Sequence, residues 1–183
     1  MGMQQDLELM ASYNQWMNAK LYEAASQLTP AELIEERGAF FGSIFGTLNH
    51  IVVADTIWLK RFATTQTASA RTLAVMVDLP MPARLDQVMF DDLPGLKAHR
   101  QWLDTVIINW VAALTDDDLE TLLSYHNTKG IASKRRYSSL IVQFFNHQTH
   151  HRGQVSTLLS QAGVDIGVTD LLALIPDEQQ AKL

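Results

Sequence analysis

The chain lacks cysteine altogether, and this absence excludes several kinds of chemistry at once. Disulfide bonds, thiolate metal ligands and a cysteine nucleophile all need a cysteine sulfur, so none of them can occur in this chain. A reaction that used a thiol would therefore have to take that thiol from its substrate.

Long apolar runs are also missing. No stretch reaches the ~18 apolar residues that span a bilayer, and residues 1–8 show no basic region followed by an apolar one. We therefore expect a cytoplasmic protein that does not associate with membranes.

Positive charge is scarce, because 14 Lys and Arg residues face 20 Asp and Glu residues and leave a net charge of −6. Binding to a nucleic-acid backbone depends largely on clustered Lys and Arg, so no nucleic-acid partner is expected. The one short basic run, Lys134-Arg135-Arg136, is interpreted as a solvated hairpin strand or loop.

Helical periodicity dominates what is present. With 183 residues, of which 47% are hydrophobic, the chain can bury one core, and we expect a single domain over residues 1–183. Apolar residues recur at three- and four-residue steps in 7–28, 44–59, about 91–114 and 138–163. Ser43 and Asp91 or Asp92 are suitable N-caps, and Gly163 fits a left-handed helix end. These signals predict an all-α four-helix bundle, in which cofactor sites lie between facing helices.

The segments between these helices carry weaker signals. Thr29 and Thr115 begin capping motifs that predict short helical turns. Residues 64–90 lack helical periodicity and are predicted to form a long connection. Residues 122–137 suggest a small β-hairpin before the last long helix. Segment 44–59 is apolar on nearly every side, which predicts burial on several faces, against the bundle core and a partner subunit. The final segment, 164–183, is expected to pack across the bundle through Leu171, Leu172, Leu174 and Ile175.

Two histidines, His147 and His151, are spaced four residues apart, so on a helix they lie one turn apart on the same face. This face also carries Phe144 and Val155 and should point into the core. Burying two imidazoles costs a few kcal/mol unless their nitrogens are satisfied, and a divalent cation satisfies one nitrogen on each ring. The spacing favours a metal site, although hydrogen-bonded core histidines remain the competing interpretation.

A third ligand must come from another helix, and His50 is the best candidate because it is the only histidine in the apolar segment 44–59. Without the other two histidines, His50 would be interpreted as an ordinary core histidine. No Glu precedes any histidine by three residues, and no His-Glu-x-x-His motif is present, so di-iron and zinc-protease architectures are excluded.

The sequence neighbours of His147 and His151 are predicted to have supporting roles. His150 lies ~100° around the helix from His151 and should face an interface or orient a ligand. Gln154 and Arg152 could orient an imidazole or an anion. Arg152 is predicted to lie off the apolar stripe, where a salt bridge is an equal alternative, with Asp55 as one candidate partner. His99 and His126 are expected to be surface or boundary residues.

Three motifs resemble the DinB or YfiT-like family of metal-dependent bundles. They are residues 48–59 (LNHIVVADTIWL), residues 146–154 (NHQTHHRGQ), and Gly163-Val164-Asp165 followed by Thr169-Asp170-Leu171-Leu172. The resemblance covers essentially the whole chain. It implies an up-down-down-up bundle that is commonly a homodimer, with a divalent metal held by His50, His147 and His151. Some members of the family are transferases or isomerases that use low-molecular-weight thiols.

These observations favour a metal-dependent enzyme that activates water or a low-molecular-weight thiol for transfer or hydrolysis of a small molecule. Zinc or nickel is the expected cation, and iron or manganese is also considered. One alternative is a non-catalytic metal-binding bundle, acting in a stress response or in interactions, whose site is closed by a fourth protein ligand. Another is a metal-free helical interaction protein with three hydrogen-bonded core histidines.

Overall fold

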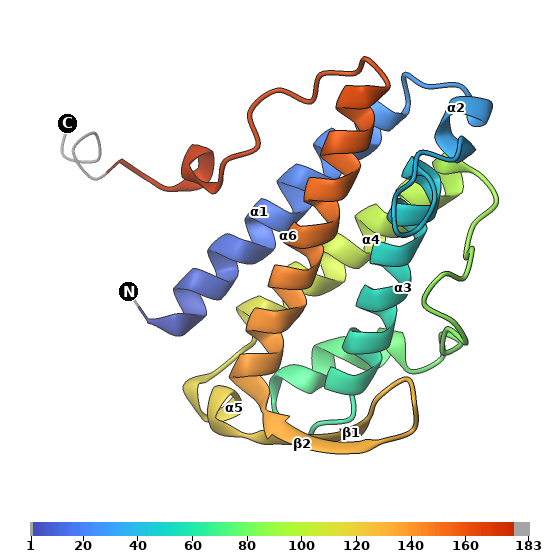
Figure 1. The fold of residues 1–183 in the computed structure, drawn as a ribbon. Helices are drawn as coiled ribbons and strands as arrows, with labels where there is room; N and C mark the ends of the chain where they lie inside the picture. Colours follow the sequence, from blue (N-terminus) through green and yellow to red (C-terminus); the bar gives the residue numbers. More distant parts are fainter. Residues whose placement is uncertain (1, 178–183) are drawn as a thin grey trace.

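Four long helices form most of the fold in the computed structural model, which describes residues 2–177. They are α1 (Met3–Ala25), α3 (Ile44–Phe62), α4 (Leu93–Ala112) and α6 (Tyr137–Gln161). Figure 1 shows α1 and α6 running in one direction and α3 and α4 in the other, so the predicted up-down-down-up bundle is confirmed. Within residues 2–177, every helix falls short of the combined length and apolarity that a membrane span requires.

The core fixes the spacing of the helices at the hairpin end of the bundle. Phe62 at the end of α3 stacks on Trp110 of α4 with 5.0 Å between ring centroids. The Trp110 indole donates a hydrogen bond of 3.1 Å to the hydroxyl of Tyr137, the first residue of α6. All three side chains are fully buried. This aromatic group ties the ends of α3 and α4 to the start of α6.

The helix ends follow the predicted capping signals closely. Ser43 accepts a hydrogen bond of 3.0 Å from the backbone N–H of Gly46 and begins α3. Asp92 caps α4, and Gly163 adopts a φ of +80° after α6. Capping boxes at Thr29 and Thr115 start the short helices α2 (Pro30–Ile34) and α5 (Asp116–Glu120). Only the bounds differ slightly: α1 begins and ends earlier than the predicted 7–28, α3 continues to Phe62, and α6 already begins at Tyr137.

The predicted hairpin is present as two antiparallel strands, β1 (Leu122–His126) and β2 (Ala132–Arg136). Its turn is closed by Asn127, whose side-chain oxygen accepts from the backbone N–H groups of Lys129 and Ile131. The basic run 134–136 lies on β2 and is solvent-exposed, as expected.

The long connection between α3 and α4 contains more structure than the sequence pattern indicates. Its residues Ser69–Met76 form the 3-10 helix η1, which buries Leu73 and Met76 completely. The Lys60 ammonium of α3 donates to three backbone carbonyls that follow, at 2.6–2.8 Å. The connection therefore covers part of α3. Burial of α3 on several faces is confirmed, but neighbouring parts of the same chain supply the cover that was assigned to a partner subunit.

The segment after α6 only partly fulfils its prediction. Leu171–Leu174 form a short 3-10 helix, η2, beside α1, and the Tyr13 hydroxyl donates to the Thr169 carbonyl at 2.7 Å. Because residues three apart eclipse in a 3-10 helix, Leu171 and Leu174 share one half-buried side. Leu172 is 74% exposed and Ile175 43% exposed, so the prediction that these two pack across the bundle is wrong. Residues 178–183 of the predicted segment lie outside the described residues.

Candidate metal centre

Three histidines from two neighbouring helices meet at one point. The Nε2 atom of His50 in α3 lies 3.3 Å from Nε2 of His147 and 3.2 Å from Nε2 of His151, both in α6. One ring nitrogen from each residue falls within 4.8 Å of the others. The three residues predicted as a triad are therefore brought together by the packing of α3 on α6 (Figure 1).

Helical geometry explains why the two α6 imidazoles meet. Residues four apart lie on the same face, and the ring centroids of His147 and His151 are 4.3 Å apart. His50 approaches from α3 with its ring centroid 4.4 Å from that of His151. His50 and His151 are buried, while His147 is half-buried and lies at the edge of the cluster.

Hydrogen bonds to oxygen fix the tautomers of two of the rings. His50 Nδ1 lies 2.8 Å from the Leu85 carbonyl, and His151 Nδ1 lies 2.7 Å from the side-chain oxygen of Gln154. Carbonyl oxygens only accept hydrogen bonds, so each Nδ1 carries the proton and each Nε2 presents a lone pair. Both lone pairs belong to the nitrogens that meet in the cluster. The hydrogen bond between Gln154 and His151 supports the prediction that Gln154 orients an imidazole.

Electrostatics keeps these rings neutral. The pKa of His50 is lowered to about 4, chiefly by burial and in smaller part by its histidine neighbours. Burial, followed by the proximity of His151 and His150, also lowers the pKa of His147 to about 4. The pKa of His151 is lowered chiefly by burial as well. Near neutral pH the cluster therefore gathers unprotonated nitrogens, which is the form that binds metal.

The spacing of these nitrogens fits a divalent cation. With a metal–nitrogen bond of ~2.0–2.1 Å, as for zinc, the nitrogens of a tetrahedral site lie about 3.3–3.4 Å apart. The Nε2 atom of His50 lies 3.3 and 3.2 Å from those of His147 and His151. No other histidine, cysteine or carboxylate among residues 2–177 joins the group. The cluster could therefore hold a metal ion through three neutral nitrogens, with at least one coordination position left open.

Two further contacts at the site have no sequence signature. The Phe41 ring stacks on the His50 ring, with 3.6 Å between centroids and 15° between planes, and meets His151 edge-on at 5.6 Å. Leu85 contributes only its backbone carbonyl, which any residue type could supply. Phe41 precedes α3, and Leu85 belongs to the connection between η1 and α4, so only the tertiary fold brings them to the histidines.

Gly46 gives Phe41 the room it needs. A Cβ atom at position 46 would lie 2.2 Å from the Phe41 carbonyl oxygen, whereas at Gly153 of α6 it would meet nothing within 4 Å. Gly46→Ala is therefore expected to destabilise the fold by about 1–3 kcal/mol through backbone overpacking. Gly153→Ala is the control and should stabilise by about 0.5–1 kcal/mol. Urea unfolding measures both, and stabilisation by Gly46→Ala would contradict this contact.

Arg152 differs from its prediction. Its side chain is buried, with 2% exposed, and donates to the Asn14 side-chain oxygen of α1 and to the Thr149 hydroxyl. Its guanidinium lies 5.3 Å from the centre of the Tyr13 ring. The alternative, a salt bridge with Asp55, is not formed, and the Asp55 carboxylate instead binds Arg100 and Gln148. Arg152 lies ~100° around α6 from His151, on a side of the helix that is buried against α1.

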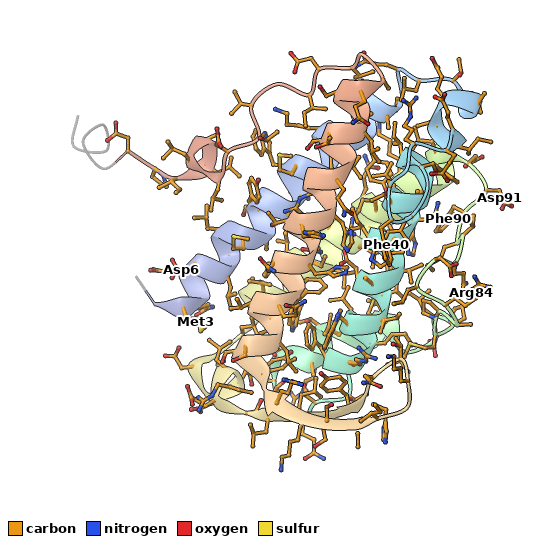
Figure 2. All side chains as sticks on the ribbon, in the orientation of Figure 1. Met3, Asp6, Phe40, Arg84, Phe90 and Asp91 are labelled. Carbon is orange, nitrogen blue, oxygen red and sulfur yellow. The ribbon has the colours of Figure 1, made fainter. Side chains whose placement is uncertain are left out.

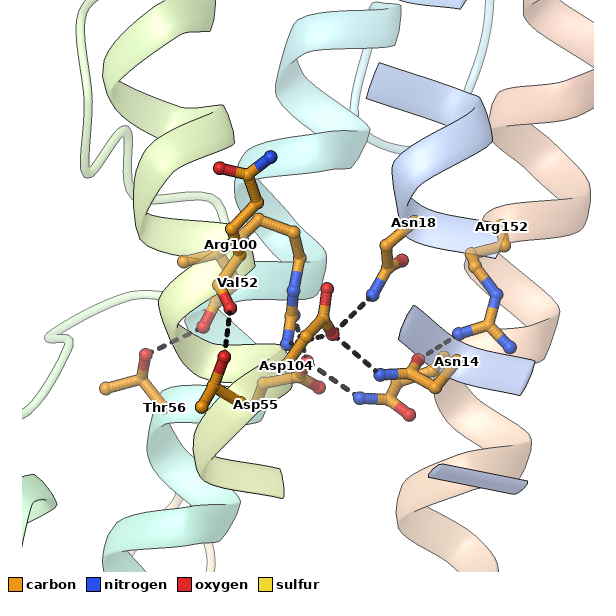
Figure 3. Close-up of polar contacts among 11 residues, drawn as sticks. Asn14, Asn18, Val52, Asp55, Thr56, Arg100, Asp104 and Arg152 are labelled. Atoms are coloured by element: carbon orange, nitrogen blue, oxygen red, sulfur yellow. Dashed lines mark hydrogen bonds and ion pairs between the residues drawn. The ribbon is translucent and has the colours of Figure 1, made fainter. Parts of the chain in front are cut away.

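A buried polar layer joins side chains of all four long helices, with Arg152 as a member from α6 (Figure 3). Arg100 of α4 forms ion pairs with Asp55 of α3 and, at 3.0 Å, with Asp104 of its own helix. Asp104 accepts hydrogen bonds of 3.0 and 2.9 Å from Asn14 and Asn18 of α1. Figure 3 shows the labelled side chains of this layer pointing toward one another. The layer has no sequence signature, because its members are scattered over four helices.

The remaining histidines lie outside the cluster, as expected. His150 is exposed, and its Nε2 lies 3.4 Å from the Gln154 amide nitrogen, so it contacts the residue that orients His151. His99 sits half-buried between the rings of Phe90 and Trp102, and His126 is exposed on β1.

Comparison with known proteins agrees with this architecture. The sequence model of the DinB family matches residues 3–181. A curated relative, "Protein DinB" of Bacillus subtilis (strain 168), is 25% identical over 158 residues, which covers 86% of this chain and 87% of the relative. No solved structure matches the chain. A family match over nearly the whole length shows that this chain belongs to the DinB family.

Proposed function

We propose that His50, His147 and His151 hold a divalent cation and that the protein is a metal-dependent enzyme. Its reaction would be a transfer or hydrolysis in which water or a low-molecular-weight thiol attacks a small-molecule substrate. The observation that carries this proposal is the meeting of the three Nε2 atoms, two of them with lone pairs fixed by hydrogen bonds at Nδ1.

A divalent cation in this position would supply Lewis acidity, which makes water or a thiol nucleophilic near neutral pH. The chain's own residues prepare the site. The Leu85 carbonyl and the Gln154 amide hold two imidazoles in the metal-binding tautomer. Phe41 covers one face of His50 and keeps water from it. Since the chain has no cysteine, any thiol in the reaction must arrive with the substrate.

The donor set narrows the choice of cation. Imidazole nitrogens suit zinc, nickel, iron and copper, whereas manganese prefers oxygen ligands. Zinc and nickel remain our first candidates, iron is the next, and manganese is the least favoured of those considered.

The alternative is a non-catalytic metal-binding bundle that serves a stress response or an interaction. A structural or sensing site of this kind is typically closed by a fourth protein ligand. Residues 2–177 contribute three candidate ligands to the cluster and no fourth histidine, cysteine or carboxylate. This open position favours the enzyme.

Activity assays test the enzymatic proposal. The protein is purified without nickel resin, stripped with a chelator and reloaded with zinc or nickel. We then expect ester hydrolysis, or consumption of a low-molecular-weight thiol with an electrophile, by the reloaded protein only. Equal turnover by the stripped protein would contradict metal dependence.

The homodimer and the cytoplasmic location remain predictions. Because other parts of the same chain cover α3, the dimer now rests on the family resemblance alone. Light scattering should give twice the 20.5 kDa mass of the chain if the dimer forms.

A further inference from the structure

Gln148 lies between the two α6 histidines in sequence but points to a different partner. Its side chain is fully buried, and its amide nitrogen donates a hydrogen bond of 2.7 Å to the Asp55 carboxylate. Asp55 belongs to α3, five residues after His50. The two helices that carry the triad are thus also joined by a buried side-chain hydrogen bond.

The Asp55 end of this contact is held firmly. Asp55 and Arg100 form an ion pair in which both side chains are 1% exposed. Arg100 in turn pairs with Asp104, which accepts hydrogen bonds from α1 (Figure 3). Because three helices fix the carboxylate, a shift of α6 would break the Gln148 hydrogen bond rather than carry Asp55 along.

Metal binding is sensitive to such shifts. Side chains one residue apart on a helix differ by ~100° in direction and 1.5 Å in height, so the position of Gln148 determines where His147 and His151 point. Metal–ligand distances in a working site hold within about 0.2 Å. A small rotation or slide of α6 would therefore separate the α6 nitrogens from His50.

We propose that Gln148 is a positioning residue for the triad: through Asp55 it holds α6 at the register that brings His147 and His151 to His50. This inference rests on the proposed metal function. Gln148 is neutral, so its loss leaves Asp55 paired with Arg100 and creates no unpaired buried charge. Its contribution to positioning can therefore be measured separately from the charge pair.

The test compares Gln148→Met with Gln143→Met in the full-length chain. Methionine keeps the length of glutamine but cannot donate to Asp55, and residue 143 is exposed on the same helix. The probe is Co²⁺, whose affinity is measured by calorimetry and whose ligand geometry is measured by visible absorption. We expect Gln148→Met to weaken Co²⁺ binding about tenfold, as loss of groups that orient metal ligands does, and to alter the absorption bands. Gln143→Met should match the wild type.

A third variant separates positioning from stability. Val111→Ala truncates a fully buried side chain of α4, which carries no candidate ligand, and should lower stability while leaving the Co²⁺ affinity intact. The inference is overturned if Gln148→Met binds Co²⁺ as tightly as Gln143→Met, or if Val111→Ala weakens binding equally. Failure of the wild type itself to bind Co²⁺ would instead overturn the proposed metal function, and this inference with it.

Discussion

Replacing Arg100 by Met is expected to lower the free energy of unfolding by about 3–5 kcal/mol, because it leaves buried carboxylates without their cation. Arg100 pairs with Asp55 and Asp104, and all three side chains are at least 97% buried. Burial already raises the pKa of both carboxyl groups against the opposing effect of Arg100. Methionine retains much of the apolar stem, so the loss reports mainly on the charge. Urea unfolding followed by circular dichroism measures it.

Arg84→Met is the matched control for this prediction. Arg84, labelled in Figure 2, also forms an ion pair, with Asp86 at 2.6 Å, but its side chain is 75% exposed and that of Asp86 is 54% exposed. Solvent screens such a pair, so no measurable change in stability is expected. If the two variants lost equal stability, the result would contradict a special stabilising role for the buried ion pairs of Arg100.

His147→Ala should abolish tight metal binding. His147 supplies one of three nitrogens, and without it the remaining pair, His50 and His151, cannot enclose a cation. The loss of affinity for zinc should exceed the ~10–100-fold that follows when only a group orienting a ligand is removed. Because His147 is half-buried at the edge of the cluster, the metal-free fold should persist. Calorimetric titration with zinc and thermal unfolding of the metal-free variant measure these two properties.

His150→Ala provides the comparison, since it removes a neighbouring histidine that is exposed and outside the cluster. We expect its zinc affinity to stay within a few-fold of the wild type, with any loss arising through its contact with Gln154. Zinc affinity that is retained in His147→Ala would argue against all metal-based interpretations of the triad.

The sequence predicted best those features that depend on local spacing. The apolar period located the long helices, and capping residues such as Ser43 placed their ends. The four-residue spacing of His147 and His151 determines a shared face before any tertiary contact is known. His50 could be added because histidine is unusual in so apolar a helix.

Features that depend on which helices are neighbours could not be read in the same way. A helical wheel gives the direction of the Arg152 side chain, but it cannot show that Asn14 lies beside it. It also cannot show that Arg100 already binds Asp55. The Leu85 carbonyl and the Phe41 ring contact His50 from irregular segments. The path of such segments cannot be predicted from a periodic sequence pattern. The 3-10 period likewise explains why Leu172 faces solvent while Leu171 is half-buried.

The proposed function depends on the binding of one divalent cation by three imidazoles of this chain. Its most direct test is to load chelator-treated protein with zinc, remove the excess, and measure both the zinc content and the X-ray absorption spectrum. We predict one zinc ion per chain, with three imidazole nitrogens at ~2.0–2.1 Å. This binding would be contradicted if no zinc were retained, or if a variant with His50, His147 and His151 all replaced by Ala retained as much zinc as the wild type.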